Sequence, residues 1–265
     1  MRPAVEATPR DAVLVDDAAL IRIMGMPVLE AVPSTGAPYE LTDPFILVHE
    51  GRFRPSDLAG KDTRHPHRGF DNLWYVLQGS ASTGHSTGPG GSVERARLSE
   101  GSLLWLRTGR GAWHAEALGA DEVDAGAGDF EFRGVLFWVN LARRDKRAEP
   151  SAEVLQREQL PVRREGDASV RTLVGEGSPL RLGTPALILD VELADGGQVT
   201  TRVPPEFQGF AYVLDGEATF GANKRRARPP QLVLLGPGGE LTVTDAAPGT
   251  RFLLMAGKPY GETPV

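Results

Sequence analysis

Short apolar runs alternate with turn signals along the chain from about residue 36 to its end. The runs are rich in Val, Leu, Phe, Tyr and Trp, and their lengths are typical of β-strands. The segments between them, such as TGPGG, GEGSP and GPGG, favour tight turns. Many short strands joined by such turns predict an all-β sandwich or barrel. The runs are PFILVHE, LWYVLQG, SLLWL, GVLFWVNLA, PALILDVEL, FAYVLDG, QLVLL and RFLLMAG.

One stretch has a helix-like pattern instead, residues 150–160 with the sequence PSAEVLQREQL. Ser151 is a candidate N-cap, and Glu153 suits the first turn of a helix. Val154 stands where a capping box needs Glu or Gln, so that motif is absent. We therefore predict one short helix here in an otherwise strand-rich chain.

A repeat divides the chain in two. YVLQG at residues 75–79 returns as YVLDG at residues 212–216, and each copy precedes an apolar strand with a Gly-rich exit. Two matches in the same order predict duplicated barrels, joined through about residues 143–180. We place the N-terminal domain at residues 1–145 and the C-terminal domain at residues 146–265.

Composition narrows the functional classes. A length of 265 residues suits one or two domains, and a net charge of −6 is poor for binding nucleic acid or anionic membranes. The absence of cysteine excludes disulfides, thiolate zinc sites and iron–sulfur clusters. No apolar run reaches the roughly 18 residues of a membrane span, and the start lacks a secretory h-region. We expect a cytoplasmic, monomeric protein that binds neither nucleic acid by itself nor membranes.

The histidines are the main chemical signal. All five lie at or before residue 114, so any imidazole chemistry belongs to the first barrel. His65 and His67 have i, i+2 spacing, which on a strand places both side chains on one face. His114 and Glu116 repeat that spacing.

Strands distant in sequence can bring the two pairs together as three imidazoles and one carboxylate. Such a nitrogen and oxygen ligand set suits iron and other first-row divalent metals, and leaves coordination positions for other ligands. Single histidines are more often structural or solvated than ligands. We therefore place His85 in a hairpin turn and interpret His49 as structural or exposed.

Three segments together resemble the pirin family of bicupins, in the cupin superfamily: HPHRGFDNLWYVLQG, GSLLWLRTGRGAWHAE and GVLFWVNLARRDKRAEP. The resemblance implies an all-β fold of two stacked cupin (jelly-roll) β-barrels with few short helices. It also implies one Fe(II) in the N-terminal barrel, held by His65, His67, His114 and Glu116, and a C-terminal barrel without metal. Aligning the two copies places Val243, Asp245, Arg202 and Pro204 opposite the four ligands.

The chain departs from the family pattern at several positions. Asp71 replaces the usual Glu, Trp74 a common small residue, and Leu136 an expected Gln. The segment after His85 lacks the usual Asp, and many pirins extend beyond the position of Val265. These differences concern the pocket and leave the ligand set intact.

Three functions follow from the resemblance. The first is a quercetin 2,3-dioxygenase-type oxidoreductase, in which O2 attacks a metal-activated flavonol-like phenolic and Glu116 accepts the hydroxyl proton. The second is a regulator that binds a protein partner according to the iron oxidation state, and the third is a structural bicupin with a vestigial site. Other divalent metals also suit the ligands. The aromatic residues expected around a flat pocket are Phe53, Trp74, Trp105 and Trp113.

Two basic segments are alternative candidates for binding. KRRAR at residues 224–228 offers a nucleic-acid patch, but it follows GAN and is better interpreted as a hairpin turn of the second barrel. RRDKRAE at residues 143–149 is interpreted as a solvated linker.

Overall fold

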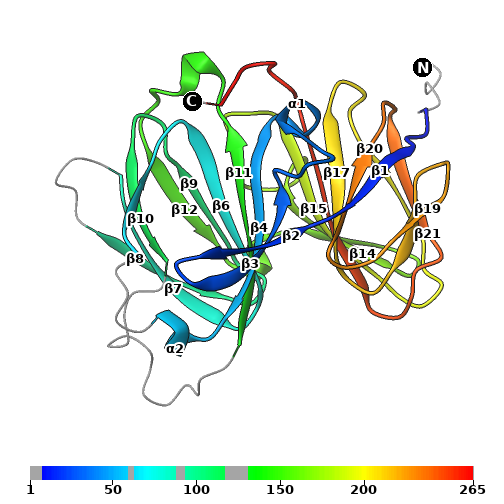
Figure 1. The fold of residues 1–265 in the computed structure, drawn as a ribbon, viewed down its shortest axis with the longest axis horizontal. Helices are drawn as coiled ribbons and strands as arrows, with labels where there is room; N and C mark the ends of the chain where they lie inside the picture. Colours follow the sequence, from blue (N-terminus) through cyan, green and yellow to red (C-terminus); the bar gives the residue numbers. More distant parts are fainter. Residues whose placement is uncertain (1–7, 59–62, 88–92, 117–130, 265) are drawn as a thin grey trace.

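The computed structural model describes residues 8–58, 63–87, 93–116 and 131–264. Within these ranges the chain forms two β-barrels packed side by side (Figure 1). Each barrel combines a seven-stranded sheet, here called inner because it faces the other barrel, with a four-stranded outer sheet. The predicted fold class of two stacked cupin barrels is confirmed.

The first barrel holds the histidines. In spatial order its inner sheet contains β12 (Ser151–Leu155), β9 (Leu103–Arg107), β6 (Phe70–Gln78), β11 (Phe132–Asn140), β4 (Phe45–Phe53), β3 (Met26–Val32) and β2 (Ala19–Ile23). Its outer sheet contains β5 (His65–His67), β10 (Ala112–Glu116), β7 (Ser80–Ser86) and β8 (Glu94–Ser99).

The second barrel repeats this plan. Its inner sheet contains β1 (Ala12–Asp17), β20 (Gln231–Leu235), β17 (Gln208–Asp215), β22 (Thr250–Gly257), β15 (Ala186–Leu193), β14 (Ala168–Val174) and β13 (Val162–Glu165). Its outer sheet contains β16 (Val199–Arg202), β21 (Glu240–Thr244), β18 (Ala218–Phe220) and β19 (Arg225–Ala227).

The described helices are short: α1 (Tyr39–Thr42), α2 (Pro55–Leu58), η1 (Arg143–Asp145) and η2 (Arg157–Gln159). The helix predicted over residues 150–160 is wrong. Residues 151–155 form β12, which pairs with β9, and only η2 is helical, with a capping box between Gln156 and Gln159. Pairing at a sheet edge buries Leu155 in the core, and this tertiary contact outweighs local helix propensity.

One strand from each half of the chain belongs to the barrel that the other half mainly forms. β1 crosses to the second barrel and pairs with β20, while β12 joins the first barrel beside β9 (Figure 1). The predicted division between residues 145 and 146 therefore does not coincide with sheet membership for these two strands.

The inner sheet of the first barrel has two different faces because side chains alternate along a strand. On β11, Val135, Phe137 and Val139 face the second barrel and join the core between the barrels. Leu136 and Trp138 face the opposite way, into the first barrel, where they line a cavity. The inner sheet therefore holds the two barrels together through one face and lines the cavity with the other.

The repeated YVL motifs lie at equivalent places in β6 and β17 and connect the barrels. The hydroxyl of Tyr75 donates to Asp190 of the second barrel at 2.6 Å, and that of Tyr212 donates to Glu50 of the first barrel at 2.8 Å. All four side chains are nearly or fully buried. Each tyrosine thus supplies a hydrogen bond to a buried carboxylate on the other barrel.

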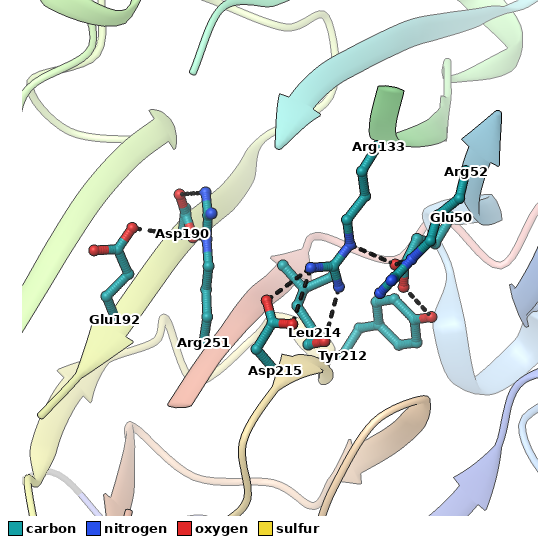
Figure 2. A network of polar contacts seen from close by, with 9 residues as sticks. All are labelled: Glu50, Arg52, Arg133, Asp190, Glu192, Tyr212, Leu214, Asp215 and Arg251. Carbon is teal, nitrogen blue, oxygen red and sulfur yellow. Dashed lines mark hydrogen bonds and ion pairs between the residues drawn. The ribbon is translucent and has the colours of Figure 1, made fainter. Parts of the chain in front are cut away.

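An arginine completes each of these contacts (Figure 2). Arg133 donates from Nε to Glu50 at 2.7 Å and also reaches Asp215 at 2.8 Å, while Arg251 holds Asp190 at 2.7 Å. Buried carboxylates need such partners, because an unpaired buried charge is strongly destabilising. The two networks therefore fix the barrels against each other.

The interior of the second barrel is filled with apolar side chains. Val199 and Val243 are partners on β16 and β21, and both are buried with Leu241, Phe220 and Phe252. The sequence contains no histidine in this half. This interior differs in chemistry from that of the first barrel, where imidazoles and a cavity occupy the space between the sheets.

Candidate metal centre

The outer sheet of the first barrel brings three predicted site residues together. His65 and His67 lie on one face of β5, as their i, i+2 spacing predicts. β10 pairs antiparallel with β5, and His114 is the direct cross-strand partner of His65. Directly opposed residues of an antiparallel pair share a face, so all three imidazoles point into the barrel.

The three rings are close enough to share one ion. Their centroids are 4.5 Å apart for His65 and His67, 5.8 Å for His65 and His114, and 5.9 Å for His67 and His114. Imidazole nitrogens about 2.1 Å from one ion, at angles of about 90–130°, place ring centroids roughly 4.5–6 Å apart. The observed spacing lies within that range.

Burial keeps two of these rings neutral. Burial, and to a smaller extent the neighbouring imidazoles, lower the pKa of His114 to about 3 and that of His67 to about 4. Both ring nitrogens of His114 are buried without a hydrogen-bond partner in the described structure. Such an unsatisfied buried group is costly, and a neutral imidazole is the form that binds metals.

His65 is oriented by its own chain. Its Nδ1 lies 2.6 Å from the carbonyl oxygen of Thr63, and because a carbonyl only accepts, Nδ1 carries the proton. In the neutral form of the ring, the lone pair is then on Nε2. This arrangement, in which a histidine donates one ring N–H to a backbone carbonyl, is typical of metal-ligating imidazoles.

Glu116 is the last residue of β10, and its backbone pairs with Thr83. Its side chain lies outside the described part of the structure, so its predicted ligand role and its predicted role as proton acceptor stay predictions. The described His, Asp and Glu side chains do not by themselves form a ready metal site. A bound ion would need Glu116 or small ring rotations to complete its ligands.

A cavity of about 390 Å³ opens against His65 and His67. This volume lies within the range of about 300–1,000 Å³ that is usual for small-molecule sites. Its walls come from the inner sheet and the β2–β3 hairpin, and are mostly apolar and aromatic. The described lining residues are Ile23, Met24, Met26, Pro27, Val28, Leu47, His49, Gly51, Phe53, His65, His67, Trp74, Phe132, Gly134, Leu136 and Trp138.

The expected aromatic lining is half correct. Phe53 and Trp74 line the cavity, and the Trp74 ring also lies 6.3 Å from that of His114. Trp105 does not, because it faces the core between the barrels and donates Nε1–H to Asp71 at 3.0 Å. Trp113 points outward and is 55% exposed, since it alternates with His114 along β10.

Of the two remaining histidines, one differs from expectation. His85 lies in β7 rather than in a hairpin turn, as the cross-strand partner of His114, and it is buried with neither ring nitrogen hydrogen-bonded in the described structure. His49 agrees with the structural rather than the exposed alternative, since it is buried in β4 and bonded to Glu30. Its place in the cavity wall depends on the pairing of β4 with β3 and β11, which no local signal specifies.

The departures from the family pattern have separate structural explanations. Asp71 is fully buried and accepts from Trp105, Arg107 and the backbone N–H of Gly183 of the second barrel, so it has a structural role. Trp74 and Leu136 are cross-strand neighbours that both line the cavity.

The basic KRRAR segment lies at the β18–β19 hairpin, as predicted.

Comparison with protein families identifies both barrels. Residues 26–139 match the Pirin model, and residues 188–265 match the model of the pirin C-terminal cupin domain. The chain belongs to the pirin family. Pirin-1 of Arabidopsis thaliana is 32% identical to it over 231 residues, which cover 84% of this chain and 75% of that relative.

Solved structures show the same pirin fold. A quercetin 2,3-dioxygenase from Acinetobacter baumannii superposes with a TM-score of 0.81 at 22% identity, covering 96% of this chain and 88% of that one. The Escherichia coli pirin YhhW in complex with nickel(II) gives a TM-score of 0.68 at 14% identity, covering 93% and 99%. Within the described part of this pirin-family chain, no helix is long and apolar enough to cross a membrane.

Proposed function

We propose that the first barrel binds Fe(II) through His65, His67, His114 and Glu116, and that it catalyses a quercetin 2,3-dioxygenase-type oxidation of a flavonol-like phenolic by O2. The observation that carries the proposal is the convergence of three imidazoles, two of which line one mostly apolar cavity. Iron supplies, when bound, Lewis acidity and redox chemistry with O2 that side chains lack.

The donor set supports a divalent first-row ion. Imidazole and carboxylate suit iron, and they also accept nickel, copper, manganese and zinc. The unpartnered nitrogens of His114 and the hydrogen bond that orients His65 fit metal binding. The nickel held by the Escherichia coli pirin makes a related ion a reasonable alternative to iron in this chain.

The cavity walls give the protein's own contribution to such a reaction. Phe53, Trp74, Phe132 and Trp138 offer aromatic surface to a flat phenolic, and apolar walls exclude water from the reacting atoms. Glu116 would accept the proton of the substrate hydroxyl, as a carboxylate close to the substrate can do. Leu136 and Trp74 narrow the cavity, so we expect imperfect orientation of quercetin and slow turnover.

A regulatory function is the second candidate. Trp113 is an exposed large aromatic side chain on the same strand as His114, and aromatic residues are enriched at protein interfaces. A change of metal oxidation state at His114 would then alter the surface offered to a protein partner through β10. A pull-down with Fe(II)- and Fe(III)-loaded protein tests this function, and equal capture in both states contradicts it.

The decisive experiment for the proposed activity is aerobic loss of flavonol absorbance. Iron-reconstituted protein should consume quercetin with matching O2 uptake, and both signals should disappear in Glu116→Gln. His65→Ala with the same added iron is the control for free iron. Equal rates for wild type and His65→Ala would refute the dioxygenase proposal and favour the regulatory one.

A further inference from the structure

His49 is the one described lining residue of the cavity, besides His65 and His67, that has an ionisable side chain. It lies on β4, whose Leu47, Gly51 and Phe53 also line the cavity, while Glu50 between them faces the second barrel. A polar group in an otherwise apolar wall typically fixes the orientation of a ligand.

A carboxylate holds this imidazole in one state. Nε2 of His49 lies 2.8 Å from Oε2 of Glu30, its cross-strand partner on β3. An ionised carboxylate only accepts, so Nε2 carries the proton and Nδ1 keeps its lone pair. Burial lowers the pKa of His49, although Glu30 opposes this effect, and the ring is neutral at pH 7. His49 thus has one satisfied nitrogen and one acceptor nitrogen.

The sheet places the His49 ring within reach of a substrate in the cavity beside the candidate centre. Glu30, His49, Leu136 and Trp74 are successive cross-strand partners on β3, β4, β11 and β6. Two strand spacings, about 10 Å, separate His49 from Trp74, whose ring lies against His114. A flat molecule of two or three fused or linked rings spans that distance.

We propose that the His49–Glu30 pair selects a planar aromatic ligand that carries an acidic hydroxyl group, and this inference rests on the proposed function of the same cavity. Nδ1 of His49 accepts a hydrogen bond from the hydroxyl. The Glu30 carboxylate fixes the tautomer and the orientation of the His49 ring, as in other histidine–carboxylate pairs.

The test compares 3-hydroxyflavone with flavone, which lacks the hydroxyl. Both are titrated into metal-free protein, and binding is followed by quenching of tryptophan fluorescence, since Trp74 and Trp138 line the cavity. Wild type should bind 3-hydroxyflavone about tenfold more tightly than flavone, the effect of roughly one good hydrogen bond. In His49→Leu the ratio should fall to about one, with the affinity for flavone unchanged.

Two further variants test the tautomer and the polarity of His49. Glu30→Gln replaces the carboxylate by an amide that can also donate to Nε2, so the tautomer with the proton on Nε2 is no longer enforced and the preference for 3-hydroxyflavone should weaken. His49→Gln conserves polarity and should retain part of the binding preference. His49→Gln also provides the test if His49→Leu does not fold, which circular dichroism would reveal.

Three results would overturn the inference: no preference for the hydroxyl in wild type, an unchanged preference in folded His49→Leu or His49→Gln, or no binding of either compound. None of these measurements uses metal or turnover. A protein that selects 3-hydroxyflavone through His49 but does not consume quercetin would retain this inference and lose the proposed dioxygenase activity.

Discussion

The stability of the metal-free protein should fall steeply as the pH drops below 6.5. His67 and His114 have pKa values of about 4 and about 3 in the folded state, because burial disfavours the imidazolium, whereas free imidazoles titrate near 6.5. Between these values the unfolded chain binds more protons than the folded chain, so acid favours unfolding. Above pH 7 these two rings cause no loss of stability, and below pH 3 the loss has reached its full size.

The size of the effect follows from the two shifts. Between pH 7 and pH 5, the difference in proton binding lowers the free energy of unfolding by about 2 kcal/mol for each ring and by about 4 kcal/mol for the pair. Proteins of this kind have total stabilities of about 5–15 kcal/mol, so the loss is a large fraction of the whole. A bound divalent ion should oppose it near neutral pH, because ligands of the folded state stabilise by mass action.

Urea unfolding of chelator-treated protein at pH 7, 6 and 5, followed by circular dichroism, measures this slope. The matched control is the His67→Gln/His114→Gln double variant, which keeps polar side chains but cannot titrate in this range. Carboxylates contribute equally to both proteins, so the wild type should lose about 4 kcal/mol more than the variant. Parallel curves would refute the account of two buried neutral imidazoles.

Other predictions test single contacts. His114→Ala should strongly lower metal content in elemental analysis after iron reconstitution, and an unchanged content would contradict the ligand assignment. Tyr212→Phe should cost about 1–3 kcal/mol in urea unfolding, since Glu50 loses a donor from the other barrel; no loss would show that water replaces it. Arg133→Met should cost about 3–5 kcal/mol because it removes the main cationic partner of buried Glu50, and a neutral effect would assign that role to Arg52.

Much of the outer sheet was predictable because it depends on local spacing. The i, i+2 rule placed His65 and His67 on one face, and the residue pattern predicted short strands with Gly-rich turns. The alternation that turns His114 inward also turns Trp113 outward, yet the sequence analysis expected Trp113 in the pocket. Applying the rule to every residue of the strand would have removed that error.

Contacts between distant strands could not be predicted in the same way. The sequence around residues 150–160 favours a helix locally, and only pairing with β9 makes its first half a strand. The cavity position of His49 requires the register between β4, β3 and β11, which no local pattern specifies. Tyr75 and Tyr212 were visible as a repeat, but their carboxylate partners lie on the opposite barrel.

The exchange of edge strands has a consequence for synthesis on the ribosome. The inner sheet of the first barrel is complete once β12 has emerged, so the candidate metal centre can form while the second barrel is still being made. β1 emerges first but pairs with β20, and the Asn223 side chain binds the backbone of Ala12 across 211 positions. At about 5–20 residues per second, this strand waits roughly 10–40 s for its partner. The earliest strand of the chain is thus among the last to find its place.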